Sequence, residues 1–202
     1  MIIRDRNNSY IYFMAEVKIL IEGFTNADSV DESGEEKTST TCVLIRDGEL
    51  IIVVDPGVLE SQSVLVDALS KEGLKVGDVN LVIITHSHLD HYRNVGMFPK
   101  AKNLEYWALW DGQKADEWEE QFTEDIRIIK TPGHNYDGLT ILVNTKDGII
   151  AIVGDVWWKE NHPQDVDPYA SDMEKLKESR QKILALADYI IPGHGPMFKV
   201  KK

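Results

Sequence analysis

The sequence predicts an α/β fold in which two packed sheets lie between outer helices. Strand-like segments dominate the first part of the 202-residue chain, a strand–helix–strand unit follows, and strands return before a final helix. No linker rich in Pro, Gly or Ser divides the chain. We therefore expect a single domain over 1–202, in which 1–13 could be an N-terminal extension and either Met1 or Met14 the true start.

The first half of the chain predicts a sheet with one amphipathic helix packed on it. Alternating or continuous apolar residues predict strands at 16–23, 41–46, 49–54 and 81–85. Asp47-Gly48 is a hairpin signal between two of these strands, and the polar, acidic stretch 26–41 predicts a loop. A helix that ends near Gly73 is expected from the helical spacing of Val64, Leu65, Ala68 and Leu69.

The second half predicts another sheet and the final helix. Strands are expected at 126–130, 139–143 and 149–153, with a turn at 146–148 between the last two. An amphipathic pattern predicts a helix over 173–187, which is followed by a short strand at 189–191. The aromatic and acidic stretch 106–120 has no clear period, so its structure is left open.

Composition narrows the classes of partner. Acidic residues outnumber basic ones by 34 to 22, which gives a net charge of -12 and argues against a non-specific nucleic-acid surface. The only cysteine, Cys42, lies in an apolar run and is expected to be a buried core residue. Because one cysteine excludes an internal disulfide, and no apolar run approaches the roughly 20 residues of a membrane helix, we expect a cytoplasmic protein without a membrane span.

A cluster of metal-ligand residue types directly follows the apolar run 81–84. It consists of His86, His88, Asp90 and His91 within six residues. Three further candidates also follow strand-like runs through glycine-containing turns: His134, Asp155 and His194. Rigid strand ends can hold side chains to the tolerance that a metal site needs, and glycine permits tight turns beside them.

Seven imidazole and carboxylate ligands predict a site with two metal ions. Such ligands suit Zn²⁺ first, with Fe, Mn, Co or Ni as alternatives, and the lack of thiolates argues against a structural zinc knot. Seven ligands are too many for one tetrahedral ion but suit two ions that share a carboxylate. Two ions about 3.5–4 Å apart can hold a hydroxide between them and polarise a scissile group.

These residues resemble the metallo-beta-lactamase-fold hydrolase superfamily over about 17–199. The resemblance implies a four-layer αββα sandwich with the metals at one edge. It also implies three groups of ligands: His86, His88 and His134 for one ion, Asp90, His91 and His194 for the other, and Asp155 as the bridge. Asp55 matches an Asp that supports the ligand loop in this family, although a simple turn residue before Pro56-Gly57 is an equal alternative.

Branches of the superfamily offer alternatives. The stretches 85–99, 131–134, 154–156 and 191–198 are similar to an animal member that acts as an RNA nuclease. Asp90-His91 resembles the glyoxalase II, lactonase and nuclease branches. The chain matches neither the helical substrate domain of glyoxalase II nor the added domains of the large RNA-processing members. Diiron oxygen reductases of this fold have Glu where this chain has His88, which disfavours oxidoreductase chemistry.

Candidate pocket residues follow the downstream ligands. Trp157 and Trp158, with Lys159 and His162 after them, could form a wall of the substrate site, and aromatic packing at the base of a loop is an equal alternative. Asn135 and Tyr136 follow His134, and Tyr136 could donate to an oxyanion. The loop 26–41 is either a lid or a plain surface loop.

The sequence therefore predicts a binuclear metallohydrolase. A hydroxide between the ions would attack an ester, lactone, thioester or phosphoester of a small molecule, and Asp90 would be the catalytic residue that orients or shuttles a proton. The alternatives are a nuclease or phosphodiesterase that acts on RNA, a mononuclear iron sulfur-dioxygenase that uses only His86, His88 and His134, and a non-catalytic metal-binding protein. The native metal, the substrate and the oligomeric state are left open.

Overall fold

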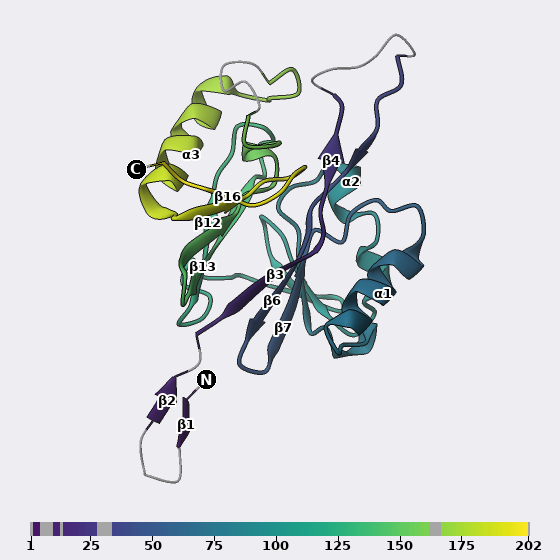
Figure 1. The fold of residues 1–202 in the computed structure, drawn as a ribbon, viewed down its shortest axis with the longest axis vertical. Helices are drawn as coiled ribbons and strands as arrows, with labels where there is room; N and C mark the ends of the chain where they lie inside the picture. The colour runs from purple at the N-terminus through teal and green to yellow at the C-terminus, as the bar shows by residue number, and fades with distance from the viewer. Residues whose placement is uncertain (1, 5–9, 13, 28–33, 162–166, 202) are drawn as a thin grey trace.

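A computed structural model of the chain describes residues 2–4, 10–12, 14–27, 34–161 and 167–201 (Figure 1). Its larger sheet has the order β11-β10-β9-β8-β7-β6-β3. The strands of this sheet are β3 (Glu16–Ile21), β6 (Cys42–Asp47), β7 (Leu50–Val54), β8 (Leu81–Ile83), β9 (Lys102–Leu104), β10 (Leu109–Asp111) and β11 (Lys114–Asp116).

The smaller sheet has the order β12-β13-β14-β15-β16. Its strands are β12 (Ile126–Lys130), β13 (Leu139–Thr145), β14 (Gly148–Ile152), β15 (Tyr189–Ile191) and β16 (Phe198–Lys199). The helices are α1 (Gln62–Lys71), α2 (Leu89–Tyr92) and α3 (Met173–Leu186), with short 3-10 helices η1 (Val76–Asp78), η2 (Val95–Met97) and η3 (Gly154–Val156). Figure 1 shows α1 and α3 on the outer sides of the molecule, with the strands between them.

Alternation along the strands explains the four layers. On β7, Ile52 and Val54 belong to the core between the sheets, whereas Val53 packs in the cluster with the buried residues of α1. On β12, Ile128 faces the same central core and Ile129 packs in the cluster that contains α3. Because successive side chains of a strand point to opposite faces, each sheet is apolar on both faces and needs a cover on each. The expected αββα sandwich is confirmed.

The helix α1 agrees with its sequence pattern except at one residue. Its N-cap is Ser61, whose side chain accepts a hydrogen bond from the backbone of Ser63, and Leu65 and Leu69 are fully buried. Burial of such a side chain stabilises the fold by about 1.5–3 kcal/mol. Val64 was expected on the buried face but is 40% exposed, because the buried face of the helix is centred on Leu65 and Leu69.

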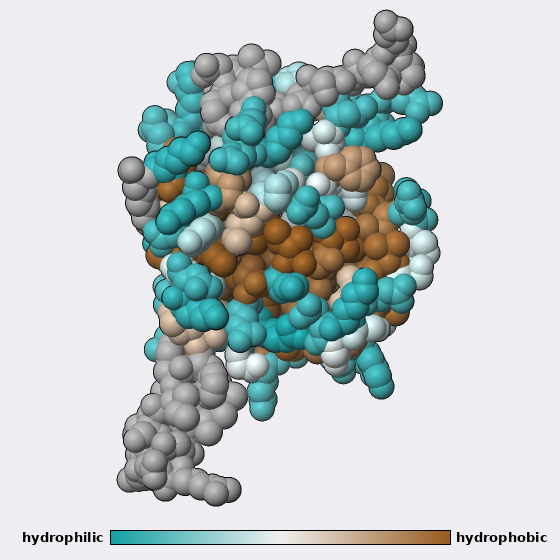
Figure 2. Space-filling model, in the orientation of Figure 1, coloured by the Kyte–Doolittle hydropathy of each residue, from teal (hydrophilic) through white to brown (hydrophobic). Residues whose placement is uncertain are grey.

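Apolar surface forms a band across the middle of the molecule in the view of Figure 2.

Strand direction brings several chain turns to one edge of the sandwich. In the larger sheet β7 and β8 are parallel. In the smaller sheet β14 and β15 are parallel, and β12 shares their direction because β13 is antiparallel to both β12 and β14. The carboxyl ends of these strands therefore lie together at the edges of their sheets. Backbone hydrogen bonds join the sheets there, from Thr41 N to Gly193 O (2.6 Å) and from Leu139 N to Thr85 O (2.7 Å).

Some segments differ from the expected structure. The stretch 26–41 is not only loop, because β5 (Thr38–Ser39) pairs with β4 (Phe24–Thr25). The first hairpin turn consists of Gly48 and Glu49, since Asp47 still pairs with Leu50. Short strands that the sequence did not reveal are β9, β10, β11 and β16. Within 1–13, β1 (Ile2–Arg4) and β2 (Tyr10–Tyr12) pair as a separate two-stranded sheet.

Cys42 lies where its apolar sequence context predicts. Cys42 is fully buried in the larger sheet, and burial raises the pKa of its thiol far above the ordinary value. A thiol of this kind is a packing residue rather than a nucleophile. Among the helices of the described residues, none has both the length and the apolar character needed to cross a bilayer.

Candidate metal centre

The seven ligand candidates come together at this shared edge. His86 and His88 follow β8, and Asp90 and His91 lie on α2. The others follow strands of the smaller sheet: His134 after β12, Asp155 in η3 after β14, and His194 after β15. The turns require glycine, because a Cβ at Gly193 would overlap the Asp155 carboxylate.

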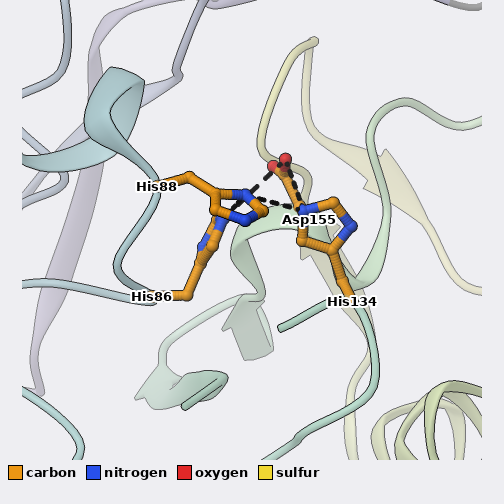
Figure 3. Close-up of side chains that lie close together, drawn as sticks. All are labelled: His86, His88, His134 and Asp155. Carbon is orange, nitrogen blue, oxygen red and sulfur yellow. Dashed lines mark hydrogen bonds and ion pairs between the residues drawn. The ribbon is translucent and has the colours of Figure 1, made fainter. Parts of the chain in front are cut away.

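One group contains His86, His88, His134 and Asp155 (Figure 3). His88 Nδ1 lies 3.0 Å from His86 Nε2 and 3.1 Å from His134 Nε2. Asp155 Oδ2 is 3.4 Å from His134 Nε2 and 4.0 Å from His86 Nε2. Figure 3 shows the four side chains pointing toward one centre, with His86 and His88 from the same loop and Asp155 and His134 from other segments. One atom from each residue can therefore reach a single small cation.

The second group contains Asp90, His91 and His194. Asp90 Oδ2 lies 3.8 Å from His91 Nε2 and 3.6 Å from His194 Nε2. Asp155 Oδ1 approaches the same two nitrogens, at 3.2 Å and 3.1 Å. Asp155 Oδ2 also lies 3.2 Å from His194 Nε2, so this carboxylate lies between the two groups and contacts histidines of both.

The chemistry of these atoms fits bound metal ions. His91 Nε2 and Asp155 Oδ1 are buried side-chain atoms without a hydrogen-bond partner, although they lie 3.2 Å apart. In the first group three imidazole nitrogens converge, and His134 already directs its Nδ1 to another carboxylate. Buried acceptors and converging lone pairs are costly unless a proton or cation lies among them. Nitrogen and oxygen donors of this kind are ligands for divalent transition metals.

Asp55 contacts the ligand loop as the family resemblance implies. It accepts hydrogen bonds from Thr85 N (2.8 Å), Thr85 Oγ1 (2.6 Å) and His91 Nδ1 (2.8 Å). Its backbone has a φ of 49°, a conformation that costs about 1 kcal/mol in a non-glycine residue. These contacts hold the strained backbone in place, and they direct His91 Nε2 toward Asp155.

Asp167 holds His134 in the same way, and sequence reasoning missed it. Its carboxylate is buried and accepts the His134 Nδ1 hydrogen at 2.8 Å. It also accepts a hydrogen bond from Tyr169 N (3.0 Å). No motif spacing marks this residue, because it is 33 positions from its partner. The only sequence signal is an Asp-Pro step shortly before α3.

Residues of β5 also contact the ligands and were missed. His194 Nδ1 lies 3.0 Å from Ser39 O and 3.2 Å from Thr38 Oγ1. Thr38 Oγ1 is 3.4 Å from Asp90 Oδ2. The stretch read as loop or lid thus contributes polar contacts to the second group.

Charge and burial shift the pKa values of the two groups of histidines in opposite directions when no metal is bound. Burial lowers the pKa of His86 far below its ordinary value, and it lowers the pKa of His88 as well. Burial also opposes protonation of His91 and His194, but the nearby Asp155 carboxylate outweighs it and raises both pKa values. Metal binding must therefore displace protons mainly from the second group.

A pocket of about 290 Å³ opens onto both ligand groups. Its walls beyond the ligands include Trp158, Tyr169, Leu89, Glu36 and Thr38. Part of the pocket lining thus comes from β5 with the residues just before it, and part from the loop before α3, and the two meet at Glu36 and Tyr169.

Only part of the expected pocket is found there. Trp158 lines it, but Trp157 does not: the backbone at Trp157 is extended, so its ring points the other way, into the cluster with α3. Tyr136 is 61% exposed and is not among the lining residues. Asn135 and Lys159 are also not among them, and His162 lies outside the described residues.

Comparisons of sequence agree with this geometry. The model of the metallo-beta-lactamase superfamily matches residues 36–129. Metallo-beta-lactamase domain-containing protein 1 of Xenopus laevis is 32% identical over 195 residues, which cover 92% of this chain and 82% of that protein. The Homo sapiens protein of that name is 31% identical over 74% of this chain, but this chain spans only 59% of its length. A probable metallo-hydrolase of Methanocaldococcus jannaschii is 31% identical, with 74% of each chain covered.

Solved structures support the fold. A putative metallo-beta-lactamase of Thermotoga maritima has a TM-score of 0.71 and 23% identity, and the match covers 92% of this chain and 99% of that one. AidC, described as a dizinc quorum-quenching lactonase, has a TM-score of 0.62 and 17% identity over 81% of this chain and 75% of that one. At these identities the likeness is one of fold.

Asp167→Asn should weaken metal binding by about 10–100-fold, because the neutral amide holds His134 less firmly than the carboxylate does. The affinity can be measured by competition with a chromogenic chelator. Asp172→Asn is the control: the Asp172 side chain caps α3 and bonds no ligand candidate, and Asn caps a helix as well as Asp does, so metal affinity should be unchanged. Equal affinities for Asp167→Asn and the wild type would remove Asp167 from the site.

Metal binding should release protons mainly from His91 and His194, because the Asp155 carboxylate raises their pKa values and so favours their protonated forms. Lowering the pH should therefore weaken the second group more than the first. Calorimetric titration in buffers of different ionisation enthalpy measures the protons released per ion. His194→Ala should reduce this number, whereas His88→Ala should not, because the pKa of His88 is lowered. The reverse order would contradict the assigned charges.

Proposed function

This chain belongs to the metallo-beta-lactamase superfamily and is a metal-dependent hydrolase, and we propose that it holds two divalent ions and hydrolyses an ester, lactone, thioester or phosphoester of a small molecule. The observation that carries the proposal is the Asp155 carboxylate, which lies between the two ligand groups and contacts histidines of both. A mononuclear sulfur-dioxygenase would need only the first group, yet the second is equally assembled.

The seven ligand candidates form a separate set for each ion, with one residue shared. His86, His88 and His134 would hold one, Asp90, His91 and His194 the other, and Asp155 would contact both. When bound, such ions act as Lewis acids that make water more acidic and polarise the bond to be cleaved. Zinc suits these donors best, and the dizinc lactonase of the same fold is consistent with it.

The protein's own groups position the reactants. Asp90 is the ligand candidate best placed to handle a proton, because its side chain is 22% exposed, lines the pocket and lies near the Thr38 hydroxyl. Asp55 and Asp167 fix the ring orientations of His91 and His134. Trp158 packs edge-on to His134, with ring centroids 6.2 Å apart, and limits water at that wall.

The pocket suits a small substrate. Its volume of about 290 Å³ is at the lower end for ligand sites. Among the described residues that line it there is no Lys or Arg to neutralise a run of phosphates. This composition favours small molecules over RNA as substrates.

The absence of an internal disulfide, with a single buried cysteine, favours a cytoplasmic location.

The test compares substrates under one condition. The protein loaded with zinc should contain two ions per chain, and it should hydrolyse small aryl esters, lactones, thioesters or phosphodiesters well above single-stranded RNA at physiological salt. Efficient RNA cleavage with little turnover of small substrates would promote the nuclease alternative. One ion with full activity would contradict the two-ion site.

Asp155→Ala tests the bridge in the same assay. Loss of the shared carboxylate should weaken at least one ion and lower turnover by about 100-fold or more. Asp125→Asn removes a buried carboxylate that bonds Ala15 and Asn144 away from the site, so it should keep two ions and normal turnover. Normal turnover by Asp155→Ala would show that the assigned bridge is wrong.

A further inference from the structure

One part of the pocket wall, beside the ligands, combines two aromatic rings and a carboxylate. Trp158 and Tyr169 both line the pocket, with ring centroids 5.7 Å apart and planes tilted by 32°. Glu36 lines it too, and its Oε2 accepts a hydrogen bond from the Tyr169 hydroxyl at 2.7 Å. Two segments far apart in sequence thus meet at the rim of the pocket through a neutral donor and a charged acceptor.

Glu36 is the acidic residue of this wall whose charge bound metal ions would not offset. Asp90 and Asp155 also line the pocket, but bound cations would offset them. Among the described lining residues Glu36 faces no Lys or Arg, and the adjacent Lys37 makes its ion pair with Glu35 at 3.1 Å. The sequences of 28–33 and 162–166 contain no Lys or Arg either. The described wall therefore keeps a net negative charge beside two aromatic rings.

The position of this wall is tied to the metal centre. Asp167 bonds His134 through its side chain and also accepts from Tyr169 N, so the backbone at Tyr169 is anchored to a ligand. Trp158 follows Asp155 by three residues and packs edge-on to His134. A substrate group bound to this wall would lie at a fixed distance from the bond that is cleaved. Its binding energy would then help to position that bond at the metal centre.

We propose that Trp158, Tyr169 and Glu36 form a subsite for an ammonium group, so that the preferred substrates are esters or thioesters whose unreactive part carries an amine or quaternary ammonium cation. Aromatic faces attract such cations through their negative quadrupole, and a nearby carboxylate adds to the attraction. The same charge disfavours carboxylate-bearing and phosphate-bearing substrates. This inference rests on the proposed hydrolase function, because it names the substrate class of that site.

The experiment uses the zinc-loaded full chain and one pair of isosteric esters. A choline ester and the 3,3-dimethylbutyl ester of the same acid differ only in the charge of the quaternary centre. The choline ester should show about a tenfold lower KM, which matches the strength of a cation–aromatic contact with partial exposure. Glu36→Gln keeps an acceptor for Tyr169 but removes the charge, and it should abolish most of this preference. Glu35→Gln removes a charge one residue away, outside the pocket, and should retain it.

Binding without turnover separates the subsite from the hydrolase function. Calorimetry of choline and 3,3-dimethylbutan-1-ol with the zinc-loaded protein should show tighter binding of choline, and Glu36→Gln should remove the difference. If neither these esters nor the small substrates of the earlier panel are hydrolysed but choline still binds selectively through Glu36, the hydrolase proposal fails and the subsite stands. Equal binding of the two alcohols to the wild type, or an unchanged preference in Glu36→Gln, would overturn the subsite.

Discussion

A buried carboxylate between two clusters of histidine is the interaction on which this site depends. Burial alone would raise the pKa of Asp155, but His194 and His91 outweigh it and hold the pKa well below the ordinary value. The residue is therefore an anion inside the protein, in contact with histidines of both ligand groups. A buried charge is tolerated only with compensating charges nearby, so the fold around Asp155 must keep imidazoles or cations in place.

The fold meets this requirement by bringing strand ends from both sheets to one edge. Parallel pairing of β7 with β8, and of β14 with β15, sets the direction of the turns that carry Asp55, the His86 loop, Asp155 and His194. Hydrogen bonds between Thr41 and Gly193 and between Thr85 and Leu139 join these turns across the sandwich. Because ligands come from both sheets, bound metal would link the two halves and stabilise the folded chain by an amount that grows with the logarithm of the free metal concentration.

The sequence predicts local features of this molecule better than distant contacts. The ligand set could be found because each member follows an apolar strand through a short turn, and the layers follow from alternation within strands. Asp167, Thr38 and Ser39 could not be found, since their contacts join segments 33 to 156 positions apart. Trp157 and Trp158 are adjacent, and only the backbone direction decides which one reaches the pocket. The strands β9 to β11 are too short to show a period.

The central claim is that Asp155 lies between two ions, and a crystal structure of the zinc-loaded protein with anomalous scattering tests it most directly. The account predicts two anomalous peaks per chain. One should lie among His86, His88 and His134, the other among Asp90, His91 and His194, with one oxygen of Asp155 directed at each. A single peak at full loading, or an Asp155 carboxylate that contacts only one ion, would contradict the account.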